Sequence, residues 1–236
     1  MEPAFFVRRF YFHGFLSESS ELQQCLGSGA ELGHVHQVDW FAHAKPEKES
    51  FEDHAVRTLE ALDLKNSDVL IGYSMGGRLL VEGARVLPPC RVHLLSTHPG
   101  LLSPEQATER EAFAKLWAER LETWKREDFE TAWNSLDLFQ GSHHRGLSLE
   151  VWKNSKRWAQ ALRHWGPQTH PQKSRVGTEK LKALATRMSV CWHVGEKDSK
   201  YRALVEADGF KMPFVVVPGA GHRVLWDQPQ IWKHLV

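Results

Sequence analysis

Three residues of this 236-residue chain are of the types that activate one another in nucleophilic or acid–base catalysis: Ser74, Asp198 and His222. A serine hydroxyl becomes reactive when a histidine takes its proton, and that histidine needs a carboxylate to fix its tautomer. Each of the three follows a short apolar run with the composition of a buried strand. Their order, serine then acid then histidine, predicts a catalytic triad at the carboxyl edge of a parallel sheet.

The surroundings of Ser74 strengthen this interpretation. It stands in Gly72-Tyr73-Ser74-Met75-Gly76-Gly77, between an apolar run and an amphipathic run that stops at Pro88-Pro89. That order predicts a strand, a tight turn and a helix, with the serine in a strained backbone conformation and its hydroxyl exposed. The glycines two residues before and after it leave room for the strand and the helix to pass closely. Taken alone, the motif is also compatible with an ordinary glycine-rich turn.

The acid and the histidine each have a simpler interpretation. Asp198 precedes a predicted helix over Ser199–Ala207, where aspartate commonly serves as the N-cap. His222 ends Gly219-Ala220-Gly221-His222, which is typical of a turn. Their order and their positions after strands favour the triad over these separate uses.

Backbone donors for a developing negative charge are also available. A predicted strand over Phe5–Phe12 runs into His13-Gly14-Phe15. The N–H of Phe15, together with that of Met75 after the serine, predicts an oxyanion hole. The alternative is a simple turn at Gly14.

Two arginines suggest an anionic substrate. Arg78 lies four residues after Ser74, one helical turn along and on the same side of the helix. A guanidinium there suits carboxylates, because its planar fork binds them through two hydrogen bonds. The alternative is an exposed arginine on an amphipathic helix. Arg110, on a helix predicted to begin at Ser103, either reaches toward the site or faces solvent.

The elements that position these residues alternate between strand and helix. Strands are predicted at Phe5–Phe12, Val35–Phe41, Asp68–Tyr73, Arg91–Ser96, Met188–Val194 and Pro213–Pro218, and helices at Ser50–Leu64, Asp128–Leu138, Ser148–Trp165, Thr178–Thr186 and Gln228–Val236, among others. This alternation predicts an α/β fold whose mostly parallel sheet has right-handed crossovers. Residues 101–174 hold a helical, tryptophan-rich block that predicts a cap inserted after Arg91–Ser96. Residues 1–100 and 175–236 then form the core domain.

Composition excludes several classes of function. A formal net charge of +1 gives no electrostatic basis for binding nucleic acid or an anionic membrane. No stretch approaches the roughly 18 apolar residues that span a bilayer, so membrane insertion is not expected. Three widely spaced cysteines form no disulfide framework and favour a reducing cytoplasm. The fourteen histidines show no metal-ligand spacing, so they are interpreted as packed or solvated.

Together these motifs resemble the α/β-hydrolase superfamily and, within it, the 2-succinyl-6-hydroxy-2,4-cyclohexadiene-1-carboxylate synthases of menaquinone biosynthesis. The resemblance covers nearly the whole chain. It rests on His13-Gly14-Phe15-Leu16, the serine motif through Arg78, His98-Pro99-Gly100-Leu101 before a lid helix with Arg110, Gly195-Glu196-Lys197-Asp198-Ser199-Lys200-Tyr201, and Gly221-His222.

The resemblance implies an elimination rather than a hydrolysis. Enzymes of this family remove a ring proton from 2-succinyl-5-enolpyruvyl-6-hydroxy-3-cyclohexene-1-carboxylate and expel pyruvate. Ser74, made basic through the histidine and the acid, would take the proton. The two backbone donors would hold charge that develops on a substrate oxygen. The arginines would bind carboxylates, Tyr73 and Trp133 would line the pocket, and no metal or organic cofactor is implied.

The sequence also departs from the family. After Asp39 it lacks the Gly-His-Gly loop common in these hydrolases and reads Trp40-Phe41-Ala42-His43-Ala44-Lys45-Pro46. The later cap helix reads Trp152-Lys153-Asn154-Ser155-Lys156-Arg157 and gives no firm counterpart to a substrate-contacting arginine of the family. Two other functions stay open, namely a serine esterase or thioesterase for a small carboxylate-bearing ester and a catalytically inactive binding module. A pocket position for Arg78 favours the synthase over the esterase, and the intact triad argues against the binding module.

Overall fold

A computed structural model describes residues 7–27, 32, 35–99, 103–167, 174–207 and 212–235. For residues 174–179 it describes the backbone alone. The strands are β1 (Arg9–Phe12), β2 (Val35–Val38), β3 (Val69–Tyr73), β4 (Arg91–Leu95), β5 (Ser189–Gly195) and β6 (Phe214–Val217). They form one sheet in the order β2-β1-β3-β4-β5-β6, and all five of these pairings are parallel. The predicted parallel sheet is confirmed.

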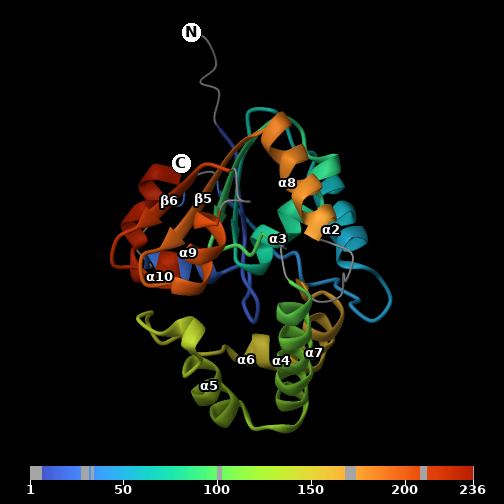
Figure 1. The fold of residues 1–236 in the computed structure, drawn as a ribbon, viewed down its shortest axis with the longest axis vertical. Coiled ribbons are helices and arrows are strands. Elements are labelled where there is room, and N and C mark those ends of the chain that lie inside the picture. The colour runs from blue at the N-terminus through green and yellow to red at the C-terminus, as the bar shows by residue number, and fades with distance from the viewer. Residues whose placement is uncertain are drawn as a thin grey trace.

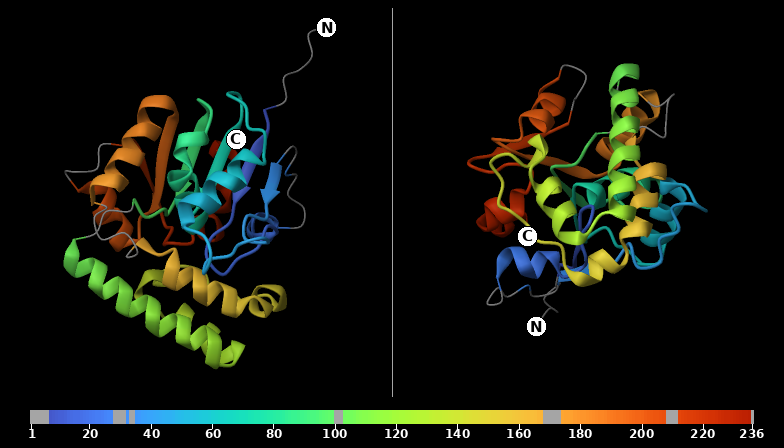
Figure 2. Two further views of the ribbon diagram at one scale, coloured as in Figure 1. Left: turned by 90° about the vertical axis from the view of Figure 1, so that its right-hand side faces the viewer. Right: turned by 90° about the horizontal axis from the view of Figure 1, so that it is seen from below.

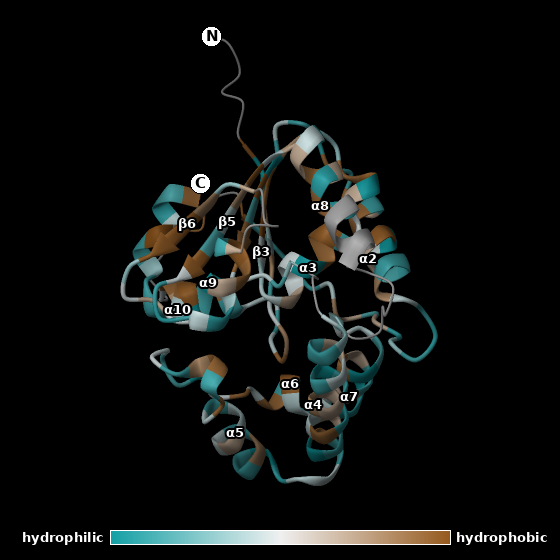
Figure 3. Ribbon diagram, viewed as in Figure 1, coloured by the Kyte–Doolittle hydropathy of each residue, from teal (hydrophilic) through white to brown (hydrophobic). Residues whose placement is uncertain are grey.

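Helices cover both faces of the sheet (Figures 1 and 2). One face carries α2 (Phe51–Glu60), α3 (Met75–Glu82) and α8 (Ser174–Arg187), and the other carries α1 (Glu21–Leu26), α10 (Val224–Asp227) and α11 (Trp232–Leu235), while α9 (Ser199–Glu206) follows β5. The central strand β3 is buried throughout, and its side chains alternate between the two cores, with Leu70 in one and Ile71 in the other. Figure 3 shows the resulting apolar strands between helices that carry hydrophilic residues outward.

After β4 the chain leaves the sheet and builds four helices across the carboxyl ends of the strands (Figure 1). They are α4 (Pro104–Thr123), α5 (Arg126–Asn134), α6 (Leu149–Lys153) and α7 (Ser155–His164). Ser103 caps α4 through a complete capping box with Gln106, as the sequence predicts. We call α4–α7 the cap helices. The bounds 101–174 stay a prediction, since 100–102 and 168–173 lie outside the described residues, including Gly100 and Leu101 of the quoted motif.

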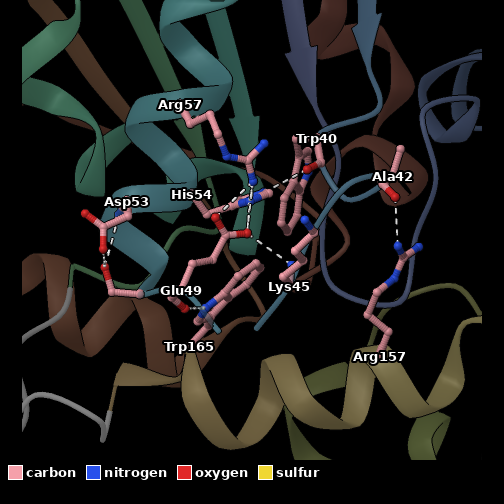
Figure 4. Close-up of polar contacts among 10 residues, drawn as sticks. Trp40, Ala42, Lys45, Glu49, Asp53, His54, Arg57, Arg157 and Trp165 are labelled. Carbon is pink, nitrogen blue, oxygen red and sulfur yellow. Dashed lines mark hydrogen bonds and ion pairs between the residues drawn. The ribbon is translucent and has the colours of Figure 1, made fainter. Parts of the chain in front are cut away.

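A polar and aromatic junction joins the end of α7 to the core (Figure 4). The Trp165 indole N–H donates to the Glu49 carbonyl at 3.0 Å, and Arg157 donates to the Ala42 carbonyl at 2.7 Å. Trp158 stacks on Phe41 with ring centroids 3.4 Å apart. The stretch after Asp39 that departs from the family therefore supplies the surface on which α7 rests.

Several elements differ from the sequence-based expectations. The helix predicted over Ser148–Trp165 is divided into α6 and α7 at Asn154, whose side-chain amide donates to the Glu150 carbonyl. The closing helix is a 3₁₀ turn at Pro229–Ile231 followed by the short α11. α1 and α10 were not predicted, because they have six and four residues and show too little periodicity. No helix in the described ranges is both long and apolar enough to cross a bilayer.

Candidate active site

Ser74 occupies the sharp turn between β3 and α3. Its φ of 50° lies in the left-handed region, which is strained for a residue with a side chain. The Ser74 N–H donates to the Leu95 carbonyl at 2.8 Å, which ties the turn to β4. A Cβ on Gly72 or Gly76 would overlap the backbone of α3 or β1, respectively. The predicted strand-turn-helix, with glycines required on both sides of the serine, is confirmed.

The three residues that the sequence singles out lie in one hydrogen-bonded line. Ser74 Oγ is 3.3 Å from His222 Nε2, and His222 Nδ1 is 2.7 Å from Asp198 Oδ2. Asp198 and His222 are 3 % and 2 % exposed. The second Asp198 oxygen, Oδ1, accepts the Tyr201 N–H at 3.2 Å and caps α9. The N-cap interpretation of Asp198 is therefore confirmed for one carboxylate oxygen, while the other oxygen contacts His222 and leaves the triad a prediction.

The loop that carries His222 is held by Asp227, an acid that sequence reasoning missed. Asp227 accepts the Gly221 N–H and the His143 N–H, each at 2.8 Å, and the Ser142 hydroxyl at 2.7 Å. It therefore ties the histidine loop to the segment that connects the 3₁₀ turn Asp137–Phe139 with α6. Nothing in the local sequence of α10 marks this role, because two of its partners, Ser142 and His143, lie more than 80 residues away.

The predicted oxyanion loop is held by a buried glutamate in the same manner. Glu21 Oε2 accepts the Tyr11 hydroxyl at 2.9 Å and the Gly14 N–H at 3.2 Å. Its other oxygen pairs with Arg145 at 2.9 Å, and Arg145 also donates to the Leu16 carbonyl at 2.8 Å. The loop carrying Phe15 is thereby anchored from both sides.

A cavity of about 960 Å³, measured out to its open mouth, lies between the sheet and the cap helices. Eight of the nine predicted site residues line it: Phe15, Tyr73, Ser74, Met75, Arg78, Arg110, Trp133 and His222. The ninth, Asp198, lies behind His222. In the described part of the chain, the N–H groups of Phe15 and Met75 donate to no protein acceptor, so both are available to a ligand.

Arg78 and Arg110 bring positive charge into this cavity. Arg78 is 8 % exposed, so the alternative of a surface arginine is wrong. It donates to the Trp165 carbonyl at 2.8 Å and approaches Glu82 at 3.4 Å. Arg110 forms no ion pair within the described ranges, and its buried Nε has no partner there. Burial lowers the pKa of both guanidinium groups.

The cavity also contains residues that were not singled out as site residues. Tyr201 packs edge-on against His222 with ring centroids 4.6 Å apart, and burial raises its pKa to about 12. Burial, reinforced by Arg78 and Arg110, holds the pKa of His98 well below its usual range, so this imidazole stays neutral. Arg145 and Arg223 are further cations that line the cavity, and the only sequence signal of Arg223 is that it directly follows His222.

The chain is similar in sequence to named synthases. A 2-succinyl-6-hydroxy-2,4-cyclohexadiene-1-carboxylate synthase from Escherichia coli O1:K1 / APEC is 28 % identical in a 233-residue alignment that covers 93 % of this chain and 88 % of the relative. The same named synthase from Escherichia fergusonii matches equally well, at 28 %.

Solved structures share the fold. MenH from S. aureus superposes with a TM-score of 0.74 and 21 % identity, covering 97 % of this chain and 91 % of that one. A thermophilic esterase from Thermogutta terrifontis gives a TM-score of 0.61 at 18 % identity, covering 97 % and 87 %. The model of the alpha/beta hydrolase family matches residues 10–232. The chain therefore belongs to the alpha/beta hydrolase family.

Proposed function

We propose that this protein is a carbon–oxygen lyase that eliminates pyruvate from 2-succinyl-5-enolpyruvyl-6-hydroxy-3-cyclohexene-1-carboxylate in menaquinone biosynthesis. The observation that carries the proposal is the joint placement of Arg78, Arg110 and the Ser74–His222 pair in one cavity. A simple ester needs the serine and the histidine but no buried guanidinium groups. A substrate with several carboxylates needs both. The synthase names of relatives at 28 % identity support the same choice.

The product of the proposed reaction is 2-succinyl-6-hydroxy-2,4-cyclohexadiene-1-carboxylate. Its structure and that of the substrate define the bonds that change. The C–H bond at ring carbon 2, next to the succinyl ketone, breaks. Double bonds C2–C3 and C4–C5 replace C3–C4, and the C5–O bond to the enolpyruvyl group breaks. The leaving enol takes up a proton and becomes pyruvate. The protein must therefore supply a base at C2 and stabilise the electron pair left there.

The site offers groups for both tasks. Ser74 Oγ takes the ring proton while its own proton passes to His222 Nε2, 3.3 Å away. Asp198 holds Nδ1 and stabilises the imidazolium that forms. The N–H groups of Phe15 and Met75 bind the ketone oxygen, onto which the charge at C2 is delocalised.

Residues that line the cavity bind the substrate. Arg78 and Arg110 bind substrate carboxylates, whereas Tyr73 and Trp133 line the pocket. We further propose that residues 101–174 act as a cap over the 1–100 and 175–236 core. Such a cap excludes water, which strengthens every electrostatic contact inside.

A pyruvate-release assay tests the proposal. Wild type is supplied with the cyclohexene substrate, and we expect pyruvate release to fall about 10³-fold or more in Ser74→Ala. Arg78→Ala is expected to lose about 10- to 100-fold in kcat/KM, mainly through KM. Arg85→Ala, an exposed arginine just after α3, is the matched control and should behave as wild type.

Wild type that releases no pyruvate but hydrolyses p-nitrophenyl esters briskly would overturn the lyase and support the serine esterase. Activity of Arg78→Ala equal to that of Arg85→Ala would remove the carboxylate role of Arg78.

A further inference from the structure

Arg223 is a buried cation that the proposed reaction has not yet used. Its residue is 4 % exposed, and it lines the cavity directly beside His222. The guanidinium lies over the Phe139 ring at 4.0 Å, and Nη1 donates to the His143 carbonyl at 2.6 Å. These two contacts fix where the side chain lies without neutralising its charge.

In the described ranges Arg223 forms no ion pair, in contrast to Arg145 nearby, whose charge is met by Glu21. A guanidinium has five N–H donors, and one carbonyl satisfies only one of them. Asp227 and Glu21 attract this charge from beyond ion-pair distance, and both carboxylates already have other partners. A cavity-lining cation with spare donors therefore fits an anionic ligand that completes the pairing.

The Tyr73 hydroxyl lies in the same part of the cavity. Within the described residues it has no hydrogen-bond partner, although its ring is buried and stands 6.0 Å from the His222 ring. The positive charges of Arg223 and Arg145 oppose the rise that burial causes in the pKa of Tyr73. A phenol donor and a guanidinium together can bind one carboxylate.

Arg78 and Arg110 belong to a different part of the cavity. Tyr201 is the other tyrosine that packs against His222. The positive charges of Arg110 and Arg78 oppose the rise that burial causes in the pKa of Tyr201. Arg78 donates to the Trp165 carbonyl and Arg110 lies over the Phe113 ring. Arg223 shares neither partner, because it lies over the Phe139 ring and donates to the His143 carbonyl. The cavity thus has two separate cationic regions, with the proposed proton-transfer histidine between them.

We propose that Arg223 and the Tyr73 hydroxyl form a second carboxylate-binding subsite, so that the cavity selects ligands with two carboxylates, one at each cationic region. The inference deepens the proposed function and rests on it only for the identity of the ligand. The proposed substrate carries carboxylates on its ring, its succinyl arm and its enolpyruvyl arm. One carboxylate at each region would hold the reacting carbon in front of Ser74.

Binding without turnover tests the subsite. In a Ser74→Ala background, we would titrate linear dicarboxylates from succinate to suberate and monocarboxylates of equal chain length, following tryptophan fluorescence. We expect at least one dicarboxylate to bind about tenfold or more tightly than its matched monocarboxylate. Arg223→Met should abolish that advantage, and Arg223→Lys should restore part of it because the charge returns without the fork.

Arg120→Met is the matched control, because Arg120 also stacks on aromatic rings, those of Trp117 and Trp124, but does not line the cavity. It should keep the dicarboxylate advantage. An unchanged advantage in Arg223→Met, or none in the parent, would overturn the subsite. If Arg223→Met does not fold, Arg223→Lys decides: full retention of the advantage would count against bidentate binding.

The two proposals fail in different ways. A dicarboxylate advantage that depends on Arg223, in a protein that releases no pyruvate, would reject the lyase and keep the subsite. Pyruvate release with the same KM in wild type and Arg223→Met would reject the subsite and keep the lyase.

Discussion

Glu21 and Arg145 form a buried ion pair, 2.9 Å long, between α1 and the segment that leads into α6. Glu21 is fully buried and also accepts the N–H of Gly14. Arg145 in turn donates to the Leu16 carbonyl. The pair therefore spans the loop that presents the Phe15 N–H, so the position of this donor depends on how the segment before α6 is seated on the core.

Breaking this pair is expected to cost stability and turnover together. Glu21→Gln leaves Arg145 buried without a counterion, which typically costs about 3–5 kcal/mol. In the proposed reaction kcat should fall more than KM rises, because the oxyanion loop loses its anchor. Urea denaturation and a double-mutant cycle with Arg145→Met measure the coupling. Asp63→Asn, in the exposed pair with Lys65, is the control and should leave the stability nearly unchanged.

Asp198 allows its two roles to be separated. Asparagine also caps helices, so Asp198→Asn should keep the folding free energy within about 1 kcal/mol of wild type. It no longer holds the required His222 tautomer, so pyruvate release should fall about 10⁴-fold. Asp198→Ala should lose both the activity and the cap of α9. Near wild-type turnover in Asp198→Asn would show that the acid serves only as a cap.

Arg110 and Arg163 are expected to shift stability in opposite directions. Arg110 has no counterion in the described residues, so Arg110→Met should stabilise the ligand-free protein by roughly 1 kcal/mol while raising KM. Arg163 binds Glu122 between α7 and α4, at 2.7 Å for one of its two bonds, so Arg163→Met should destabilise by roughly 1 kcal/mol. Thermal unfolding of both variants gives the signs. A loss of stability in Arg110→Met would mean that its charge is satisfied within the protein.

Two touching histidines should make the fold sensitive to acid. His93 Nδ1 lies 3.0 Å from His193 Nε2, and burial lowers the pKa of His93 to about 4 and of His193 to about 3. The unfolded chain therefore takes up these protons first. Their contribution is complete above about pH 6.5 and is lost as the pH falls, by up to about 1.4 kcal/mol per pH unit for each histidine.

Replacing both with glutamine should flatten the dependence of unfolding free energy on pH between pH 6.5 and 4. His234→Gln changes an exposed histidine and should leave the slope as it is. An equal slope in all three proteins would rule out the histidine pair as its source.

The sequence was sufficient to predict the candidate triad residues. It was insufficient to predict the residues that hold their loops in place. Ser74, Asp198 and His222 each lie within a few residues of a strand end. Local patterns therefore predict that all three lie at the same edge of the sheet. Glu21 and Asp227 were not identified because each joins a nearby loop to a distant segment, through Arg145 and His143 respectively. A charged residue in a short helix gives no local sign that it is buried.

The same limit applies to the cap. The start of α4 was predicted because its capping box is local to Ser103–Gln106. The position of α7 on the core depends on the packing of Trp158 against Phe41, which lies more than a hundred residues earlier in the chain. That long-range packing cannot be derived from the periodicity of either segment.

The most direct test of proton abstraction at ring carbon 2, the step assigned to Ser74, is single-turnover pyruvate release from substrate deuterated at that carbon. If Ser74 removes this proton as the C5–O bond breaks, deuterium should slow release in the wild type. Equal rates of pyruvate release from the protonated and deuterated substrates, or no release from either, would contradict the proposed proton abstraction at this carbon.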